Sequence, residues 1–259
     1  MTSIQYEKPP DGPAANGTPL ELPGLFVTGT DTEVGKTIVA SAIAATLAAR
    51  GERVAVFKPT VTGLDEATGA PPDHELLKAS AHSTQELDEV SPYRFGPPLS
   101  PHLAAELAGT RIEPPRLRAA ATRAAAGADV LIVEGVGGLL VPLTYDYLVR
   151  DFARDLDLPV LIVARPGLGT VNHTLLTLES ARAAGLEVVA VVFTNWPDDP
   201  GQPELSNRLT VAALGDVEVA TLGPVYTGPV ISPAVDLPAH RWLRRPRARP
   251  LPEPLVVPI

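Results

Sequence analysis

Short runs of branched apolar residues alternate with longer segments rich in alanine and leucine from residue 25 to residue 222. Most of these runs are apolar at nearly every position, which is typical of strands buried on both faces of a parallel sheet. The runs predict five strands and a weaker sixth, at residues 25–28, 53–58, 129–134, 159–164, 187–193 and 218–222.

The segments between these runs have helical patterns, and glycines stand where the helices should end. Gly51, Gly109, Gly127 and Gly185 are placed as helix C-caps. The alternation predicts an α/β fold in which a mostly parallel sheet carries helices on both faces. Ligands of such folds bind at the carboxyl ends of the strands, so functional residues are expected there. The predicted helices cover residues 37–50, 73–82, 101–109, 114–126, 147–157, 172–184 and 204–214.

The chain of 259 residues has the length of one large α/β domain or two small ones. We predict one domain over residues 24–240, flanked by two tails. Residues 1–23 hold five prolines and are predicted to be disordered. Residues 241–259 are rich in proline and arginine. This tail could contact an anionic partner, but a solvated extension without a function is the favoured interpretation.

Composition excludes several classes of function. The chain has no cysteine, so disulfides, thiol catalysis and thiolate metal sites are ruled out. Its apolar runs are shorter than the roughly 20 residues of a membrane span, and the N-terminus lacks the apolar centre of a secretory signal. We therefore expect a cytoplasmic protein without a membrane partner. The net charge of −9 argues against binding nucleic acid, which requires a basic surface.

The first predicted strand runs directly into the sequence GTDTEVGKT, Gly29 to Thr37. Glycines let a backbone approach phosphates, and successive N–H groups at the start of a helix bind anions. Lys36 would reach the outer phosphates and Thr37 would bind Mg²⁺. The alternative is a glycine-containing turn without a ligand, which the order of strand, loop, Gly-Lys-Thr and helix disfavours. Two features are unusual. Five residues separate the glycines where four are usual, and Asp31 and Glu33 are acidic.

Charged residues also close the second and third predicted strands. Lys58 ends a buried strand, where a lone charge is costly to desolvate, so it is predicted to be a second cation beside Lys36. A lysine that extends to solvent is the alternative. Glu134 ends the third strand, precedes a glycine-rich turn, and suits the hard cation Mg²⁺. Asp73 opens a predicted helix and is either a further ligand or only an N-cap.

Other polar residues in loops and at helix starts are weaker candidates. Thr62 lies in the loop after the second strand, and Asn172 resembles an N-cap. His173 is either a buried or capping histidine or a catalytic one. Asn195 follows the fifth strand and its amide suits a nucleobase edge, although asparagine before a turn is common.

Taken together, residues 25–225 resemble dethiobiotin synthetase, the family of ATP-dependent cyclo-ligases of biotin synthesis. The resemblance rests on GTDTEVGKT, K-P-x-x-T-G, SPHLAAELAG, VEGVGGLLVPL and LGTVNHTLLTLE, in this order. These enzymes carboxylate 7,8-diaminononanoate with CO₂, phosphorylate the carbamate with ATP, and close a ureido ring as phosphate leaves. The resemblance implies a P-loop NTPase-type fold, Mg²⁺ as cofactor, ATP as co-substrate, and a homodimer with the substrate near the subunit boundary.

The resemblance also implies roles for individual residues. The catalytic residues would be Lys58 and Lys36. The residues that hold Mg²⁺ would be Thr37, Asp73 and Glu134. The residues that contact the substrate would be Thr32, Thr62, Gly169 and Asn172, the last two reaching the substrate of the partner subunit. The residues around the nucleotide would be Glu33, Val34, Gly35, Lys36, Thr37, Ile38, Asp73, Glu134, Gly135, Val136, Gly137, Asn195, Trp196, Gly223, Pro224 and Val225.

A loop that serves both a diamine and a triphosphate would account for the unusual spacing. The additional residue widens the loop, and Thr32 can donate to the carbamate. We infer that Asp31 and Glu33 turn away from the phosphates, because repulsion would be severe at low dielectric. One of them would instead face a substrate amine or a structural N–H. The loop side offers no spare arginine for the remote substrate carboxylate, which favours a site completed by a second subunit.

Two other interpretations stay open. One is a nucleotide-dependent switch of the partitioning-ATPase type, whose output is partner binding. Such switches carry a lysine early in the loop, as in G-K-G-G-x-G-K-T, where this chain has Thr30. The other is an ATP-dependent amide ligase with the same scaffold that acts on a different substrate. The loop after Asn195 shows no clear pattern for reading the base, so the nucleotide preference stays open as well.

Overall fold

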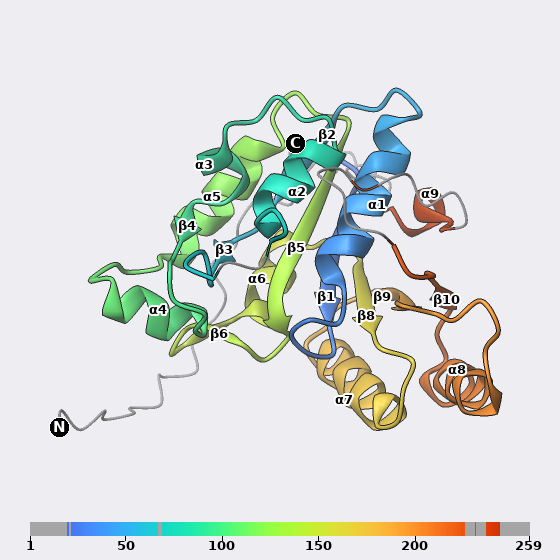
Figure 1. Cartoon of the computed structure of the whole chain (residues 1–259). Helices are drawn as coiled ribbons and strands as arrows, with labels where there is room; N and C mark the ends of the chain where they lie inside the picture. The colour runs from blue at the N-terminus through green and yellow to red at the C-terminus, as the bar shows by residue number, and fades with distance from the viewer. Residues whose placement is uncertain (1–19, 21, 67–68, 226–230, 232–236, 244–259) are drawn as a thin grey trace, which may run out of the picture.

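The structure is a computed structural model of the chain and describes residues 20, 22–66, 69–225, 231 and 237–243. A six-stranded sheet with the strand order β10-β9-β8-β1-β5-β2 forms its centre (Figure 1). All neighbouring strands in this sheet pair in parallel. The six predicted strands and the mostly parallel sheet are thereby confirmed. The strands are β1 (Gly24–Gly29), β2 (Val54–Phe57), β5 (Val130–Gly138), β8 (Val160–Ala164), β9 (Val188–Phe193) and β10 (Val219–Thr221).

Helices cover both faces of the sheet, because alternate residues of its strands enter two separate hydrophobic clusters. Phe26 of β1 belongs to a cluster with residues of α4 to α8, whereas Leu25 and Val27 belong to a cluster with residues of α1, α2 and α9. The seven predicted helices are present, with ends that differ by a few residues. They are α1 (Lys36–Ala48), α2 (Asp73–Ser80), α4 (Pro101–Leu107), α5 (Pro114–Ala124), α6 (Val149–Leu156), α7 (Thr170–Ala183) and α8 (Gln202–Gly215).

The glycines predicted to end four of these helices all have a positive φ, between 63° and 87°. Several short elements were not predicted, because two to four residues are too few to show a periodic pattern. They are α3 (Leu87–Val90), α9 (Ala239–Trp242) and the two-stranded pairs β3 (Thr60–Val61) with β4 (Tyr93–Arg94) and β6 (Pro142–Thr144) with β7 (Tyr147–Leu148).

Strand β2 lies at one edge of the sheet and is fixed there by contacts other than strand pairing. The side-chain amide of Gln85 accepts from the N–H of Val56 at 2.8 Å and donates to its carbonyl oxygen at 3.1 Å. The N–H of Lys58 donates to the carbonyl of Val90 at 2.8 Å. These bonds occupy edge groups that would otherwise be open to another strand. They also define where the chain leaves β2, and hence where Lys58 lies.

The predicted tails fall mostly outside the described residues, which leave out 1–19, 21 and 244–259. Leu20 and Leu22 pack against the core at the N-terminal end. Helix α9 spans the predicted boundary at residue 240, and its Trp242 is only 2% exposed, so the packed core reaches at least to this residue. Within the part of the chain that the structure describes, no helix is long and apolar enough to cross a membrane.

Candidate active site

The loop from Gly29 to Thr37 connects β1 to α1 and is held by the two neighbouring strands. The N–H of Thr30 donates to the carbonyl of Val163 in β8 at 2.9 Å. The hydroxyl of Thr194, at the end of β9, donates to the carbonyl of Val34 at 2.7 Å. Gly35 has φ 93°, and an added Cβ there would lie 3.0 Å from Cγ2 of Thr194. Sequence reasoning missed Thr194, although it directly follows a strand, as Lys58 does.

The acidic residues of the loop have different surroundings. Asp31 accepts the N–H of Thr32 on Oδ1 at 2.7 Å, and its carbonyl oxygen accepts from Nζ of Lys36 at 2.9 Å. Asp31 therefore faces a structural N–H, one of the two roles inferred for an acidic residue here. Glu33 is exposed and has φ 57°. Lys36 is buried, and burial lowers its pKa to about 8, a shift that Glu134 opposes and Lys58 reinforces.

Four of the predicted residues meet just after β2 and in the middle of β5, next to the start of α1. Glu134 was predicted to end its strand, but β5 continues to Gly138, because the glycine-rich segment after Glu134 stays paired with β1. Nζ of Lys58 lies 2.5 Å from Oε1 of Glu134 and 2.8 Å from Oδ2 of Asp73. The hydroxyl of Thr37 donates to the same Oε1 at 2.8 Å. Glu134 is fully buried and Lys58 is 3% exposed, whereas the side chain of Asp73 is 47% exposed. Lys58 is therefore a paired, buried cation and does not extend to solvent.

The charges of this cluster determine one another's pKa values. Burial lowers the pKa of Lys58, but Asp73 and Glu134 outweigh it and hold that pKa above its usual range. Burial raises the pKa of Glu134, with Lys58 in opposition. Desolvation would also raise the pKa of Asp73, but Lys58 outweighs it and keeps that pKa low. The two carboxylates thus stabilise the ammonium form of Lys58 inside the protein.

The same cluster supplies oxygen ligands that suit a hard cation. Oε2 of Glu134 is buried and has no hydrogen-bond partner within the described ranges. With Oδ2 of Asp73 and the Thr37 hydroxyl, it gives oxygen ligands of the kind that Mg²⁺ takes beside phosphates and water. Helix α2 has Pro72 at its N-cap and no side-chain cap bond, so capping does not explain Asp73. Among the described residues, no group of three or more His, Cys, Asp or Glu side chains forms a protein-only metal site.

The glycine-rich turn after Glu134 lies against the phosphate loop. Gly138 is the register partner of Gly29. Gly137 has φ 57°, and an added Cβ would lie 2.7 Å from Cγ2 of Val141 and 3.5 Å from the hydroxyl oxygen of Thr32. The predicted segment Gly135–Gly137 therefore borders the loop, with Thr32 beside it, and a side chain at residue 137 would enter the space between them.

The residues predicted around the nucleobase lie beyond β9 and β10. Asn195 is exposed with φ 49°, and the Trp196 ring stacks on Phe193 with centroids 6.1 Å apart. The N–H of Trp196 donates to the carbonyl of Leu222, directly before Gly223 and Pro224. Ile38 and Val225 pack against one small cluster. The structure thus brings the end of β10 next to the helix that begins at the phosphate loop.

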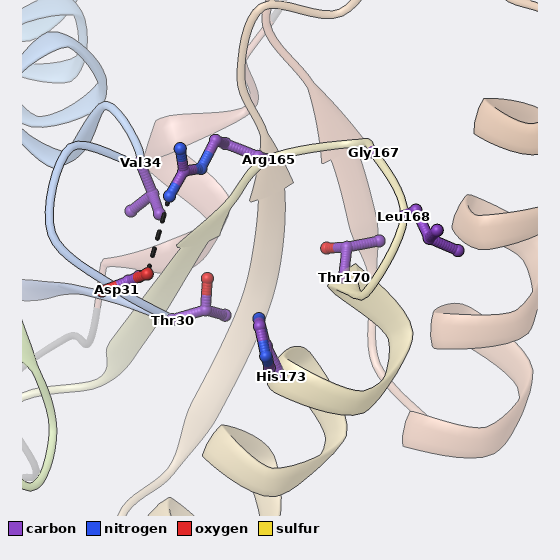
Figure 2. Close-up of a pocket in the computed structure, with 8 residues that line it drawn as sticks. All are labelled: Thr30, Asp31, Val34, Arg165, Gly167, Leu168, Thr170 and His173. Atoms are coloured by element: carbon purple, nitrogen blue, oxygen red, sulfur yellow. Dashed lines mark ion pairs between the residues drawn. The ribbon is translucent and has the colours of Figure 1, made fainter.

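The residues predicted to contact the substrate come from three segments of the chain: the phosphate loop, the loop after β3 and the start of α7. Thr62 is half-buried just after β3, whereas Asn172 is exposed in the first turn of α7. Gly169 precedes α7 with φ 92°. His173 is exposed and lines a cavity of about 260 Å³ between the phosphate loop and the segment that joins β8 to α7. Figure 2 shows this cavity, with Thr30 and His173 among its lining residues.

Arg165 also lines this cavity and bears on one expectation from the sequence. It directly follows β8, and its guanidinium lies 3.6 Å from Oδ2 of Asp31 (Figure 2). The expectation was that the loop side has no spare arginine. An arginine does lie there, because β8 is directly beside β1 in the sheet, but its guanidinium pairs with Asp31.

The chain was compared with known protein families and proteins. Residues 23–226 match the family model described as AAA domain (AAA_26). A protein named ATP-dependent dethiobiotin synthetase BioD from Anaeromyxobacter dehalogenans is 46% identical over 182 residues, covering 70% of this chain and 81% of the relative. The protein of the same name from Bacillus subtilis is 37% identical over 201 residues, covering 78% and 87%. That from Bacillus thuringiensis is 39% identical over 207 residues, covering 80% and 85%.

Among solved structures, chloroplast FtsY from Physcomitrella patens aligns with a TM-score of 0.43 and 17% identity, covering 92% of this chain and 67% of FtsY. A likeness at that level has no bearing on function. The sequence relatives, in contrast, match over most of their own length. The matched family model spans residues 23–226, which include all the clustered residues. The chain therefore belongs to the dethiobiotin synthetase family.

Proposed function

We propose that this protein is an ATP-dependent dethiobiotin synthetase of biotin synthesis. It converts 7,8-diaminononanoate, CO₂ and ATP to dethiobiotin, ADP and phosphate. The observation that carries the proposal is the meeting of Lys58, Asp73 and Glu134 with the phosphate loop at one edge of the sheet. The identity to proteins of that name over most of the chain supports the same activity. The enzyme would act in the cytoplasm, where ATP is made available.

The reaction divides into three steps. One amine attacks CO₂ and loses a proton, which gives a carbamate. A carbamate oxygen then attacks the γ-phosphorus, the bond from that phosphorus to ADP breaks, and a carbamoyl-phosphate mixed anhydride forms as ADP leaves. The second amine attacks the carbonyl carbon, phosphate and a proton leave, and the ureido ring closes. The protein's main contribution is to position the reactants and to offset negative charge on the transferring phosphoryl group.

The clustered residues suit these requirements. The loop N–H groups and Lys36 would hold the triphosphate, with its carbamate partner beside Thr32 and Thr62. Lys58 arrives from a different strand and would lie where the carbamate oxygen meets the γ-phosphate. Asp73 and Glu134 keep Lys58 charged although it is buried. Asn195 and residues 223–225 would surround the base.

Mg²⁺ is part of the proposal, with Thr37, Asp73 and Glu134 as the residues that hold it directly or through water. It would offset charge on the β- and γ-phosphates. A structure with Mg-ATP is expected to show direct oxygen–metal distances of about 2.1 Å. EDTA should abolish ring formation, and added Mg²⁺ should restore it. If Asp73 lies far from the ion in that structure, Asp73 is removed from the ligand set.

A homodimer is also proposed, with residues 168–174 at a two-fold interface. Leu168 is fully exposed, and Leu176 is 55% exposed on α7, so this end of the molecule presents apolar side chains. Leu176→Glu is expected to shift the protein toward monomers in sedimentation and to lower ring formation in parallel. The matched control is Leu107→Glu on α4, where Leu107 is 67% exposed. A strictly monomeric and fully active wild-type protein would contradict the dimer.

The decisive experiment measures phosphate release with Mg-ATP and bicarbonate, with and without 7,8-diaminononanoate, and detects the cyclic urea by mass. Phosphate release that depends on the diamine, with a matching urea product, is the expected result. A rate indifferent to the diamine would favour a nucleotide-dependent switch. Phosphate release that depends instead on another amine and a larger acid would favour an amide ligase. The same assay with other nucleoside triphosphates measures the nucleotide preference.

A further inference from the structure

Arg165 is the first residue after β8 and reaches across to the phosphate loop. The atoms closest in this contact are Nη2 of Arg165 and Oδ2 of Asp31, 3.6 Å apart, and both side chains are more than half exposed. Figure 2 shows the guanidinium extending from the strand end toward the loop. Asp31 belongs to the five-residue spacer that distinguishes this loop from the usual four-residue one.

Asp31 braces this spacer through two further contacts. Its Oδ1 accepts the N–H of Thr32, and its carbonyl oxygen accepts from Nζ of Lys36. The carboxylate therefore fixes the loop at Thr32, while the same residue holds the lysine that would approach the phosphates. This arrangement carries an electrostatic cost, because a full negative charge lies inside a loop that is to bind a highly charged anion.

We propose that Arg165 is a positioning residue whose guanidinium offsets the charge of Asp31, so that Asp31 can brace the phosphate loop without weakening triphosphate binding. The inference rests on the proposed use of this loop for ATP. Arg165 has no need to touch the nucleotide in this role, because it acts through Asp31. The additional loop residue and Arg165 then have linked roles. The additional residue widens the loop, and Arg165 offsets the charge of Asp31, which stabilises the widened loop.

The test is the binding of a non-hydrolysable ATP analogue with Mg²⁺, measured by calorimetry at about 0.05 M and about 0.5 M salt. Arg165→Met is expected to raise the Kd about three- to fivefold at low salt, the range of an exposed ion pair. The effect should fade at high salt, because the charges are exposed and screened. Arg165→Lys should restore most of the affinity.

The variant that separates this role from others is Arg165→Met combined with Asp31→Asn. Asparagine keeps an acceptor for the Thr32 N–H but removes the charge, so the double variant should bind the analogue as the wild type does. A double variant as weak as Arg165→Met would mean that Arg165 contacts the nucleotide directly, and would overturn the inference. An unchanged Kd in Arg165→Met would overturn it as well.

A matched control is Arg241→Met, which removes an equally exposed partner of Glu218 near the opposite end of the sheet. Its Kd should equal that of the wild type at both salt concentrations. Wild-type protein that binds no triphosphate analogue would overturn the proposed function itself. Wild-type binding with no effect of Arg165→Met would overturn only the role of Arg165.

Discussion

Lys58→Met is expected to lower the free energy of unfolding by about 3–5 kcal/mol, the usual cost of leaving a buried charge without its partner. Lys58 is 3% exposed and Glu134 is fully buried, with 2.5 Å between Nζ and Oε1. Methionine fills most of the same space, but it leaves two carboxylates, Asp73 and Glu134, close together and without a cation from residue 58. Urea unfolding, with the slope compared between variants, measures the difference.

The double variant Lys58→Met with Glu134→Gln is the internal control for this prediction. Removing the second charge relieves the repulsion, so the double variant should be more stable than Lys58→Met alone. Glu218→Gln, at the exposed pair with Arg241, should cost only about 0–1 kcal/mol. A Lys58→Met protein as stable as the wild type would show that the buried contact adds no net stability.

The pH dependence of the stability difference between the wild type and Lys58→Met follows from the direction in which the pKa of Lys58 is shifted. The folded pKa of Lys58 is raised above its ordinary value, because Asp73 and Glu134 outweigh the effect of burial. A group with a raised folded pKa contributes stability that is fully present below its unfolded pKa, about 10.4 for lysine, and that is lost progressively as the pH rises from there through the folded pKa. The contribution of the Lys58 charge to the free energy of unfolding should therefore not decline between pH 7 and pH 9.

Most of the central sheet could be predicted from sequence because its strands are buried on both faces. Such strands appear as continuous apolar runs, and β1, β5 and β8 were located within one or two residues at their starts. The short pairs β3–β4 and β6–β7 could not be predicted, since their pairing depends on contacts between distant loops. The strand order was equally out of reach, because the alternation of strand and helix is compatible with several orders.

The site shows the same contrast between features visible in a local sequence pattern, which were predicted, and contacts between distant segments, which were missed. Lys58 and Glu134 were each predicted to be functional because ligands of such folds bind at the carboxyl ends of the strands. Their direct ion pair was not predicted and is seen only in the structure. Asp73 stayed ambiguous because an acid at a helix start is also a common N-cap. Arg165 was missed because only the pairing of β1 with β8 brings it to Asp31, and an arginine after a strand is ordinarily solvated.

Lys58→Ala is expected to lower kcat for ring formation by ~10²–10³, about 2.7–4 kcal/mol, with a much smaller change in the KM for ATP. Lys58 comes from the end of β2, outside the phosphate loop, and would lie where the carbamate oxygen meets the γ-phosphate. An interaction that strengthens only as that bond forms changes kcat, not ground-state binding. Steady-state assays with saturating diamine, bicarbonate and Mg-ATP measure the effect, at a temperature where the variant is folded.

Two other lysines make this prediction specific. Lys36 belongs to the phosphate loop, where its Nζ is held by the Asp31 carbonyl, so Lys36→Ala should weaken triphosphate binding and all later steps together. Lys78 lies in the last turn of α2, at the other end of the helix from Asp73, and Lys78→Ala should leave kcat and KM unchanged. Because Lys58→Ala is also less stable, its kcat is calculated per mole of folded protein. Near-normal kcat would then mean that Lys58 serves only the buried ion pair, and the role in phosphoryl transfer would pass to Lys36 and the loop backbone alone.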